Sequence, residues 1–136
     1  MTSEAVDDLL KTLGMQIVRA SADEVVVEWT VSAKHHQPMG IVHGGVYCSA
    51  IETACSVGAS LSAHERDPKM VAVGLENHTS FIRAARQGKL RATARPITRG
   101  RTTQVWEADV RDESDRILAT GRVRLLCVAI DAALGS

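Results

Sequence analysis

A single carboxylate, Glu52, lies within the most apolar predicted helix of the chain, in the segment HGGVYCSAIETACSVGAS. No other Asp, Glu, Lys or Arg occurs between residues 44 and 63. Burying an unpaired carboxylate among small apolar side chains costs free energy. Three explanations follow: an ion pair with an arginine from elsewhere in the chain, a place in a polar subunit interface, or a reactive carboxylate facing a pocket that adjusts its pKa.

Two glycines, Gly44 and Gly45, stand where this helix begins. The backbone N–H groups of a first helical turn have no acceptor within the helix and lie at the positive end of its dipole. Such groups can hydrogen-bond a carbonyl oxygen and stabilise negative charge that develops on it. Glycine also lets a substrate approach the backbone closely. A plain tight turn is the alternative interpretation, and the glycine pair alone does not exclude it.

The spacing of Gly44 and Glu52 limits how they can cooperate. Eight residues of helix span about 12 Å, which is too far for both groups to touch one carbonyl of the same chain. Either the two groups act separately, or two helices run antiparallel and each Gly44 meets the other chain's Glu52. Small residues on the same face would permit such an approach: Gly45, Cys48, Ser49, Cys55, Ser56 and Ala59. That arrangement requires at least a dimer with sites at its interface.

The elements that must hold these residues can be read from hydrophobic periodicity. A short helix is predicted at residues 3–13, with Ser3 as its cap and Gly14 as its end. Strands are predicted at residues 15–22 and 24–32, the second turning Val25, Val27, Trp29 and Val31 to one face. A loop rich in Pro and Gly, AKHHQPMGIVHGG, leads into the long helix at residues 44–63.

The remainder of the chain reads as four strands, at residues 70–83, 88–99, 101–112 and 116–130. Their hairpin-length connections predict an antiparallel meander. One long apolar helix with six strands predicts an α+β fold in which a curled sheet wraps around a helix. At 136 residues the chain is expected to be one domain, residues 1–136.

Composition argues against several classes of function. Lys and Arg balance Asp and Glu at 16 each, and four aromatic residues are few for a base-stacking surface, so a nucleic-acid partner is not expected. No apolar run approaches the roughly 20 residues that span a membrane, and the N-terminus lacks a signal pattern. Three cysteines without CxxC spacing favour reduced thiols in a cytoplasmic protein over disulfides or a metal site.

The stretch QPMGIVHGG followed by VYCSAIETACS closely resembles the motif of hotdog-fold acyl-CoA thioesterases. The resemblance extends from about Met15 to Val128, including the later segment RQGKLRATARPITRGRTTQVWEADVRDESDRILATGRVRLL. The branch it resembles is the phenylacetate-pathway type, with one kind of 4-hydroxybenzoyl-CoA thioesterase and the proofreading thioesterase of enterobactin synthesis. The resemblance implies a hotdog fold, a dimer formed through the sheets and commonly a tetramer, and no cofactor beyond the coenzyme A of the substrate.

The resemblance also implies roles for individual residues. Glu52 matches the catalytic carboxylate, acting as nucleophile or as general base towards water, and Gly44 matches the glycine whose N–H polarises the thioester carbonyl. Gln37 matches a position that helps to hold the carbonyl or the water. His43 matches a histidine of variable contribution. Ser56, one turn beyond Glu52, matches a Ser or Thr that can hydrogen-bond the carboxylate, as its helical spacing also allows.

Some family features have no clear counterpart. A further histidine that some relatives carry aligns with Phe81, which leaves a second general acid unassigned. The other histidines, His35, His36, His64 and His78, are expected in loops or on the surface. A run of basic residues without acidic ones lies between residues 83 and 101. It could meet coenzyme A phosphates or form a solvated strand face, and its candidates for phosphate binding are Arg83, Arg86, Arg99 and Arg101.

The resulting expectation is hydrolysis of an acyl-CoA or acyl-carrier-protein thioester to a free acid and a thiol. A non-catalytic acyl-CoA binding or sensing protein on the same scaffold is the alternative. A hotdog hydratase is a third interpretation, but its Asp/His motif cannot be located in the sequence.

Overall fold

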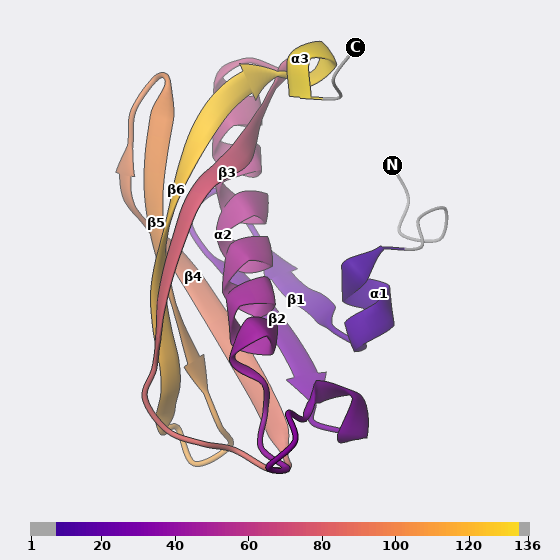
Figure 1. Ribbon diagram of the computed structural model, residues 1–136. Helices are drawn as coiled ribbons and strands as arrows, with labels where there is room; N and C mark the ends of the chain where they lie inside the picture. Colours follow the sequence, from indigo (N-terminus) through magenta and orange to yellow (C-terminus); the bar gives the residue numbers. More distant parts are fainter. Residues whose placement is uncertain (1–7, 134–136) are drawn as a thin grey trace.

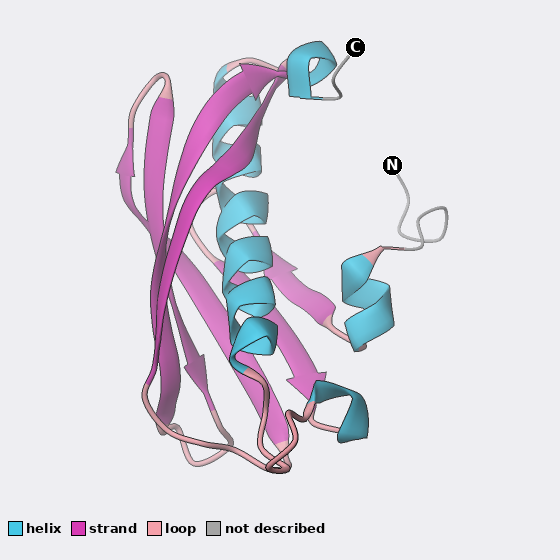
Figure 2. Ribbon diagram, viewed as in Figure 1, coloured by secondary structure: helices cyan, strands magenta, loops and turns pink. Residues whose placement is uncertain are grey.

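A six-stranded antiparallel sheet curls around one long helix, α2 (Gly44–Arg66), in the computed structural model, which describes residues 8–133 (Figure 1). The strands are β1 (Gln16–Ala20), β2 (Val25–Thr30), β3 (Met70–Phe81), β4 (Lys89–Arg99), β5 (Thr103–Arg111) and β6 (Ile117–Ala129). Figure 2 shows the helix lying against one face of the sheet while the other face has no helical cover. The predicted α+β architecture is confirmed. No helix within residues 8–133 is long and apolar enough to cross a membrane.

The order of the strands differs from a simple meander. It is β1-β2-β4-β5-β6-β3, so β4, β5 and β6 form the expected hairpins while β3 pairs with β6 and β4 with β2. The reason is that α2 carries the chain from β2 across the sheet to the far edge, where β3 begins (Figure 1). Consequently β3 and β1 are the two edge strands, and only β6 pairs with β3 within the described chain.

The apolar face of α2 packs on the sheet through close approach at one glycine. A Cβ on Gly58 would overlap the indole ring of Trp106, which is fully buried. The Trp106 Nε1–H donates to Gln104 Oε1 at 2.8 Å, and Gln104 Nε2 donates to the Ala59 carbonyl at 3.2 Å. Cys55 and Ala59 were expected on the small-residue face, but both are fully buried because they turn towards the sheet.

The N-terminal helix α1 (Leu9–Leu13) is capped by Asp8, whose side chain accepts from the Lys11 N–H at 3.1 Å. Gly14 ends it in the left-handed conformation at φ 67°, as predicted. The expected cap Ser3 lies outside the described residues. Two short helices were not predicted: the 3-10 helix η2 (Ala33–His35) inside the expected loop, and α3 (Ile130–Ala133) directly after β6.

His35 was expected in a loop or on the surface; it lies within the expected loop, in η2, but not on the surface, because the residue is only 1% exposed. Its Nε2 lies 2.6 Å from the Leu13 carbonyl, and its Nδ1 accepts from the Ser32 N–H at 2.9 Å. With both ring nitrogens engaged, His35 ties η2 to the end of α1. His64 and His78 are exposed and His36 is half-buried, as expected.

Candidate active site

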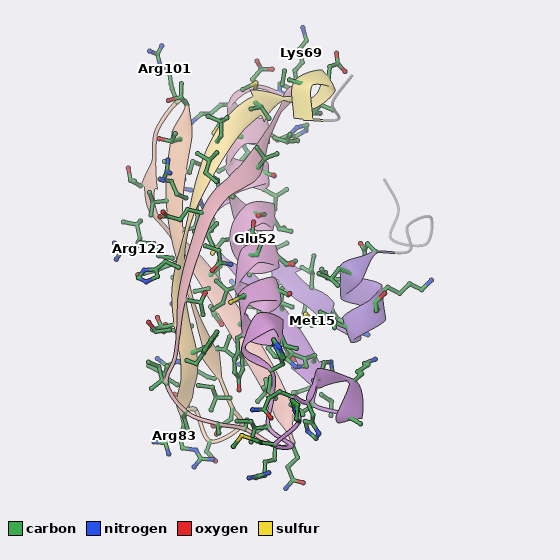
Figure 3. All side chains as sticks on the ribbon, in the orientation of Figure 1. Met15, Glu52, Lys69, Arg83, Arg101 and Arg122 are labelled. Carbon is green, nitrogen blue, oxygen red and sulfur yellow. The ribbon has the colours of Figure 1, made fainter. Side chains whose placement is uncertain are left out.

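Glu52 lies half-buried in the middle of α2, where its carboxylate faces strand β3 (Figure 3). Ser56 Oγ donates to Glu52 Oε2 at 3.2 Å, and Asn77 Nδ2 lies 3.3 Å from Glu52 Oε1. No Lys or Arg within residues 8–133 forms an ion pair with this carboxylate. Neutral donors, and not an arginine, therefore hold it in the isolated chain.

Asn77 was not predicted, and it connects the carboxylate to the strand. Its Nδ2 also donates to the Cys48 carbonyl at 3.1 Å, one helical turn before Glu52. Thr79 Oγ1 donates to Asn77 Oδ1 at 2.6 Å, so the amide oxygen has a donor of its own. Because the amide oxygen accepts from Thr79, the amide nitrogen is the atom that faces Glu52.

Gly74 in β3 makes room for the carboxylate. A Cβ at this position would overlap Glu52 Oε2. The pairing of β3 with β6 shifts by one residue between Gly74 and Glu76, which marks a β-bulge beside the carboxylate. The strand thus adapts its backbone at the point where α2 presents the Glu52 side chain.

The N-terminus of α2 opens into a second feature, a pocket of about 270 Å³. Its lining comes from the loop before α2, the first turn of α2 and the end of β3: Gln37, Ile41, Val42, Gly44, Tyr47, Phe81, Ile82, Arg83 and Ala84. The N–H of Gly44 has no hydrogen-bond acceptor within residues 8–133. It is therefore available to a ligand in this pocket.

Gln37 and His43 have different places relative to this pocket. Gln37 lines it, and its Oε1 accepts from the Met39 N–H, which leaves the Nε2 group as the donor that the side chain can offer. His43 is the N-cap of α2 and its Nδ1 accepts from the Gly45 N–H at 2.8 Å. The His43 ring is thus engaged with the helix end and is not part of the pocket lining.

Tyr47 and Phe81 form the aromatic wall of the pocket. Their ring centroids are 6.1 Å apart with an interplanar angle of 36°. The Phe81 ring lies directly over the α-carbon of Gly44, where a Cβ would meet it at 2.5 Å. Tyr47 is 2% exposed, and its hydroxyl is buried without a hydrogen-bond partner among the described residues. Burial raises the pKa of Tyr47 above its usual value, so the phenol is neutral at physiological pH.

The structure thus brings the predicted residues together in two groups. Glu52 and Ser56 are in contact, as their spacing predicts, and Gln37 and Gly44 line one pocket. Glu52 and Gly44 remain eight residues apart on one continuous helix, about 12 Å along its axis. Within one chain the two groups do not form a single site.

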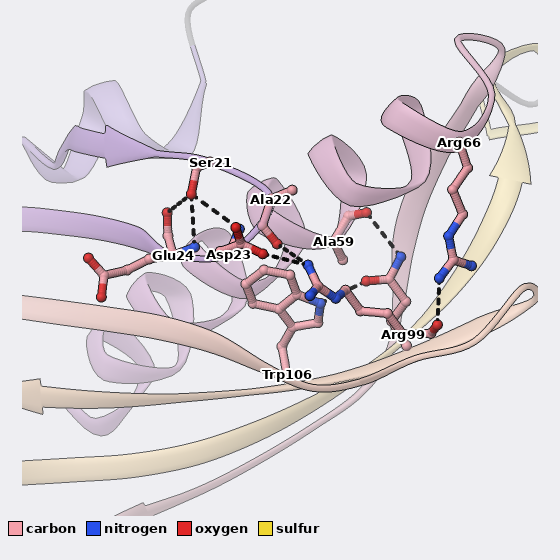
Figure 4. A network of polar contacts seen from close by, with 9 residues as sticks. Ser21, Ala22, Asp23, Glu24, Ala59, Arg66, Arg99 and Trp106 are labelled. Carbon is pink, nitrogen blue, oxygen red and sulfur yellow. Dashed lines mark hydrogen bonds and ion pairs between the residues drawn. The ribbon is translucent and has the colours of Figure 1, made fainter.

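The four arginines that were candidates for phosphate binding fall into two groups, at opposite ends of the sheet. Arg83 lines the pocket at Gly44, and Arg86 Nη1 donates to the Gly40 carbonyl at 3.4 Å in the adjoining turn. Figure 3 places Arg83 and Arg101 at opposite ends of the molecule. Arg99 donates to the Ala22 carbonyl and to Asp23 Oδ1, both at 2.8 Å, in the network of Figure 4.

Several basic residues between positions 83 and 101 lie on an exposed strand face and form ion pairs with glutamates. Arg91 and Lys89 both form ion pairs with Glu28, and Arg95 forms one with Glu24. These pairs lie along β4 and β2 and are exposed on their basic side. The solvated-face interpretation therefore describes these three residues.

All three cysteines are free thiols. Burial, with smaller contributions from Glu52 and Glu107, raises the pKa of the Cys55 thiol, which disfavours its thiolate. Within residues 8–133 there is no group of three or more His, Cys, Asp or Glu side chains placed to hold a metal ion.

Four residues of the two groups escaped sequence reasoning: Gly74, Asn77, Tyr47 and Phe81. Gly74 and Asn77 reach Glu52 only through the packing of β3 on α2. A glycine inside a predicted strand was the signal available for Gly74, whereas Asn77 stands in the polar run ENHTS and has no such signal. Tyr47 was given no role in the site, and Phe81 was noted only as the residue aligned with a family histidine.

Comparison with known proteins identifies the class. Residues 39–119 match the model of the Thioesterase superfamily, and the chain belongs to that family. It is 37% identical over 113 residues to a Mycobacterium tuberculosis protein named as an esterase, covering 83% of this chain and 81% of the relative. It is 37% identical over 114 residues to the 1,4-dihydroxy-2-naphthoyl-CoA hydrolase of Listeria monocytogenes, covering 84% and 90%.

The fold has matching crystal structures. A thioesterase structure from Haemophilus influenzae superposes with a TM-score of 0.86 at 30% identity, over 93% of this chain and 87% of the other. The M. tuberculosis esterase structure gives a TM-score of 0.85 at 35% identity, over 88% and 95%. The hotdog fold and the thioesterase class are therefore confirmed.

Proposed function

We propose that the protein hydrolyses an acyl thioester of coenzyme A, or of an acyl carrier protein, to a free acid and a thiol. The observation that carries the proposal is the Glu52 carboxylate, which neutral donors from Ser56 and Asn77 orient without any cation in the described chain. A carboxylate held in this way can act as a nucleophile or a base. Membership of the Thioesterase superfamily supports the thioester.

The proposed site is completed by a second copy of the chain. Strand β3 is an edge strand, so two copies can pair their β3 strands antiparallel about a two-fold axis. Because α2 packs on the same sheet, the two long helices would then also run antiparallel. This brings the partner's Glu52 to the pocket at Gly44, as the 12 Å separation requires. A dimer of this kind, further assembled into a tetramer as in the family it resembles, is part of the proposal.

In the proposed reaction, the Gly44 N–H donates to the thioester carbonyl oxygen and stabilises the negative charge that forms there. A carboxylate oxygen of the partner's Glu52 attacks the carbonyl carbon, the carbon–sulfur bond breaks, and the thiolate leaves and takes up a proton. Water then cleaves the mixed anhydride to the free acid. In the alternative route the partner's Glu52 removes a proton from water while that water attacks.

Other predicted residues take supporting roles in this proposal. Ser56 orients the carboxylate, and the Gln37 Nε2 group is placed to donate to the carbonyl or to the attacking water. His43 caps α2 and so fixes the helix end that presents the Gly44 N–H. Arg83 is the proposed contact for a coenzyme A phosphate because it lines the pocket, with Arg86 beside it.

Arg99 and Arg101 lie at the other end of the sheet from Arg83 and are not used for the same phosphate in one chain. Arg99 is held by the Ala22 carbonyl and Asp23. These two arginines remain candidates only for the pocket of the partner subunit, which an antiparallel arrangement of the helices would bring near.

We propose that the acyl group of the substrate is apolar. A groove of about 550 Å³ starts at Ser56 and follows the second half of α2, and its lining is Ser56, Val57, Ser60, Leu61, His64, Val71 and Ile130. It begins at the residue that holds the Glu52 carboxylate, so an acyl chain or aromatic ring bound to the reacting carbonyl can enter it. Free thiols on all three cysteines support a reducing, cytoplasmic location.

The experiment that tests the function is thiol release from short, medium, long and aromatic acyl-CoAs, with hexanoyl-CoA and benzoyl-CoA included. The Glu52→Gln variant is expected to fold but to lose most hydrolysis, whereas Glu107→Gln, a carboxylate on the uncovered face of β5, is expected to keep it. Near-normal turnover by Glu52→Gln would contradict the assignment of Glu52 as the catalytic carboxylate. Tight binding of these thioesters by the wild type without thiol release would favour the non-catalytic alternative.

Oxygen-18 water in a single turnover distinguishes the two routes. Label that enters the carboxylate of Glu52 supports the anhydride, because water that attacks the anhydride at the enzyme carbonyl leaves its oxygen on the protein. Label found only in the product acid, together with an unlabelled Glu52 over repeated turnovers, supports the general-base route.

A further inference from the structure

The pocket at the N-terminus of α2 carries one polar group that the proposed mechanism does not use. The Tyr47 hydroxyl is buried and lacks a hydrogen-bond partner within residues 8–133. Leaving a buried polar group unpaired costs free energy. Among the described residues, the Trp29 Nε1–H is the one other buried side-chain polar group without a hydrogen-bond partner. Because Tyr47 lines the pocket, a ligand bound there is a candidate for the missing partner.

The position of Tyr47 on the helix directs it to the same ligand as Gly44. The two residues are three apart, so they lie one above the other on the same face of α2. The side chain of a helical residue leans back towards the N-terminus and covers the preceding turn. Both residues line the 270 Å³ pocket, and the Phe81 ring packs against both.

The groups that this pocket offers are donors. The Gly44 N–H has no acceptor among the described residues, Gln37 offers Nε2 because its Oε1 already accepts from Met39, and Arg83 contributes a guanidinium. The Tyr47 phenol stays protonated at neutral pH, because burial raises its pKa. No Asp or Glu lines the pocket. A pocket with this lining fits an oxygen acceptor such as a carbonyl that gains negative charge.

We propose that Tyr47 is a catalytic residue whose phenolic O–H, together with the N–H of Gly44, hydrogen-bonds the carbonyl oxygen of the bound thioester. The inference rests on the proposed function, since it places the thioester carbonyl at Gly44. In the first step the carbonyl becomes a tetrahedral alkoxide, and two donors share its charge. The Tyr47 proton stays on the phenol and strengthens its bond to the oxygen as the charge develops. Phe81 keeps water away from both donors, which makes each of them more effective.

The test uses Tyr47→Phe, which removes one oxygen and keeps the ring that packs on Phe81. Loss of one oxyanion donor typically lowers kcat by about 10²–10³, so we expect a fall of at least tenfold in kcat with a smaller change in KM. The midpoint of thermal unfolding should stay the same or rise, because an unpaired buried group is removed. Ser62→Ala is the matched control: it removes a hydroxyl from another buried residue of α2, about 22 Å further along the helix axis.

A second measurement keeps the proposal testable if Tyr47→Phe folds poorly. Tyr47 is the single tyrosine of the sequence, so growth on 3-fluorotyrosine labels it alone and replaces one ring hydrogen next to the hydroxyl by fluorine. Phenacyl-coenzyme A, in which a methylene separates the carbonyl from sulfur, serves as an unreactive ketone. The methylene ketone of hexanoyl-CoA replaces it if the aliphatic thioester is the better substrate. Binding should shift the fluorine resonance, and the infrared carbonyl band of the bound ketone should lie lower in wild type than in Tyr47→Phe.

The outcomes separate this inference from the proposed function. A kcat of Tyr47→Phe within about twofold of wild type, or a fluorine resonance that saturating ketone does not move, overturns the role of Tyr47. Either result leaves the function standing if Glu52→Gln is inactive and the wild type hydrolyses thioesters. Failure of the wild type to release thiol removes the proposed function and this inference together.

Discussion

The carboxylate of Glu52 lies against the bare α-carbon of Gly74, in a space that a methyl group would fill. The two residues come from different elements, the middle of α2 and the bulged part of the edge strand β3. Only a residue without a side chain lets the carboxylate reach the donors on Ser56 and Asn77 at this depth. The bulge in β3 and the position of the Glu52 carboxylate on α2 therefore depend on each other.

Gly74→Ala tests this relationship. The added methyl group must push the Glu52 carboxylate away from its donors, while the half-exposed strand edge should tolerate the change. We expect a fall in kcat of at least tenfold with a shift of only a few degrees in Tm, because misplacing a catalytic group by about 1 Å can cost 10²-fold. Steady-state kinetics and thermal unfolding of the same preparation measure both. Unchanged kcat would show that the carboxylate position does not matter.

Substitution of Asn77 should lower kcat more than substitution of Thr79. Asn77→Ala removes a donor to Glu52 Oε1 directly, whereas Thr79→Val removes only the hydroxyl that orients the amide. Both changes should lower kcat, and the Asn77 change should lower it more, because Thr79 acts through Asn77. The double variant should resemble Asn77→Ala alone, since the two residues share one network. Additive losses in the double variant would contradict this chain of hydrogen bonds.

Sequence reasoning reached the parts of the site that lie on one element. Glu52 and Ser56 are one helical turn apart, and their contact follows from that spacing. Asn77 and Gly74 could not be found in the same way, because only the crossing of β3 over α2 brings them to Glu52. The same limit explains why β3 was expected beside β4, since short connections predict neighbours but α2 carries β3 to the opposite edge. The burial of His35 could not be predicted from the sequence, because it depends on the distant Leu13 carbonyl.

Gly58→Ala should be a stability variant without a direct catalytic effect. Its methyl group would overlap the buried Trp106 ring, which is fixed by its bond to Gln104. Overpacking of this kind typically costs about 1–3 kcal/mol of unfolding free energy. Chemical denaturation should show a lower midpoint, and Ser62→Ala on the same helix should change the midpoint far less. Equal stability of Gly58→Ala and wild type would show that α2 can move away from the sheet without loss.

Tyr47 provides a prediction about pH. Burial raises the pKa of Tyr47 in the folded protein above its ordinary value of 10.0, and in the unfolded chain the phenol should titrate near that value. The contribution of the neutral phenol to the free energy of unfolding is therefore fully present below pH 10. It is lost as the pH rises towards the pKa of Tyr47 in the folded protein. Because the chain has one tyrosine, absorbance of tyrosinate near 295 nm reports it alone. The native protein should titrate at higher pH than the unfolded protein, and coincident titrations would contradict the burial of the hydroxyl.

Gly44 permits a substitution that removes the proposed donor and has a matched control for its effect on the Phe81 ring. It is the first residue of α2, a position where proline is well tolerated, and His43 before it has extended backbone with ψ 134°. The N–H that proline lacks has no acceptor among the described residues, so no internal hydrogen bond is lost. Gly44→Ala is the matched control, because it moves the Phe81 ring in the same way but keeps the N–H. Gly44→Pro should lose much more turnover than Gly44→Ala.

The central claim is that Gly44 of one chain works with the Glu52 of the partner subunit, and mixed dimers test it most directly. Chains carrying Gly44→Pro and chains carrying Glu52→Gln, with different affinity tags, are co-expressed, and the doubly tagged dimer is purified. One of its two sites then contains an intact Gly44 and an intact Glu52 from different chains, while the other lacks both. We predict about half of the wild-type turnover per dimer, although each parent homodimer is inactive. A mixed dimer as inactive as both parents would contradict the account.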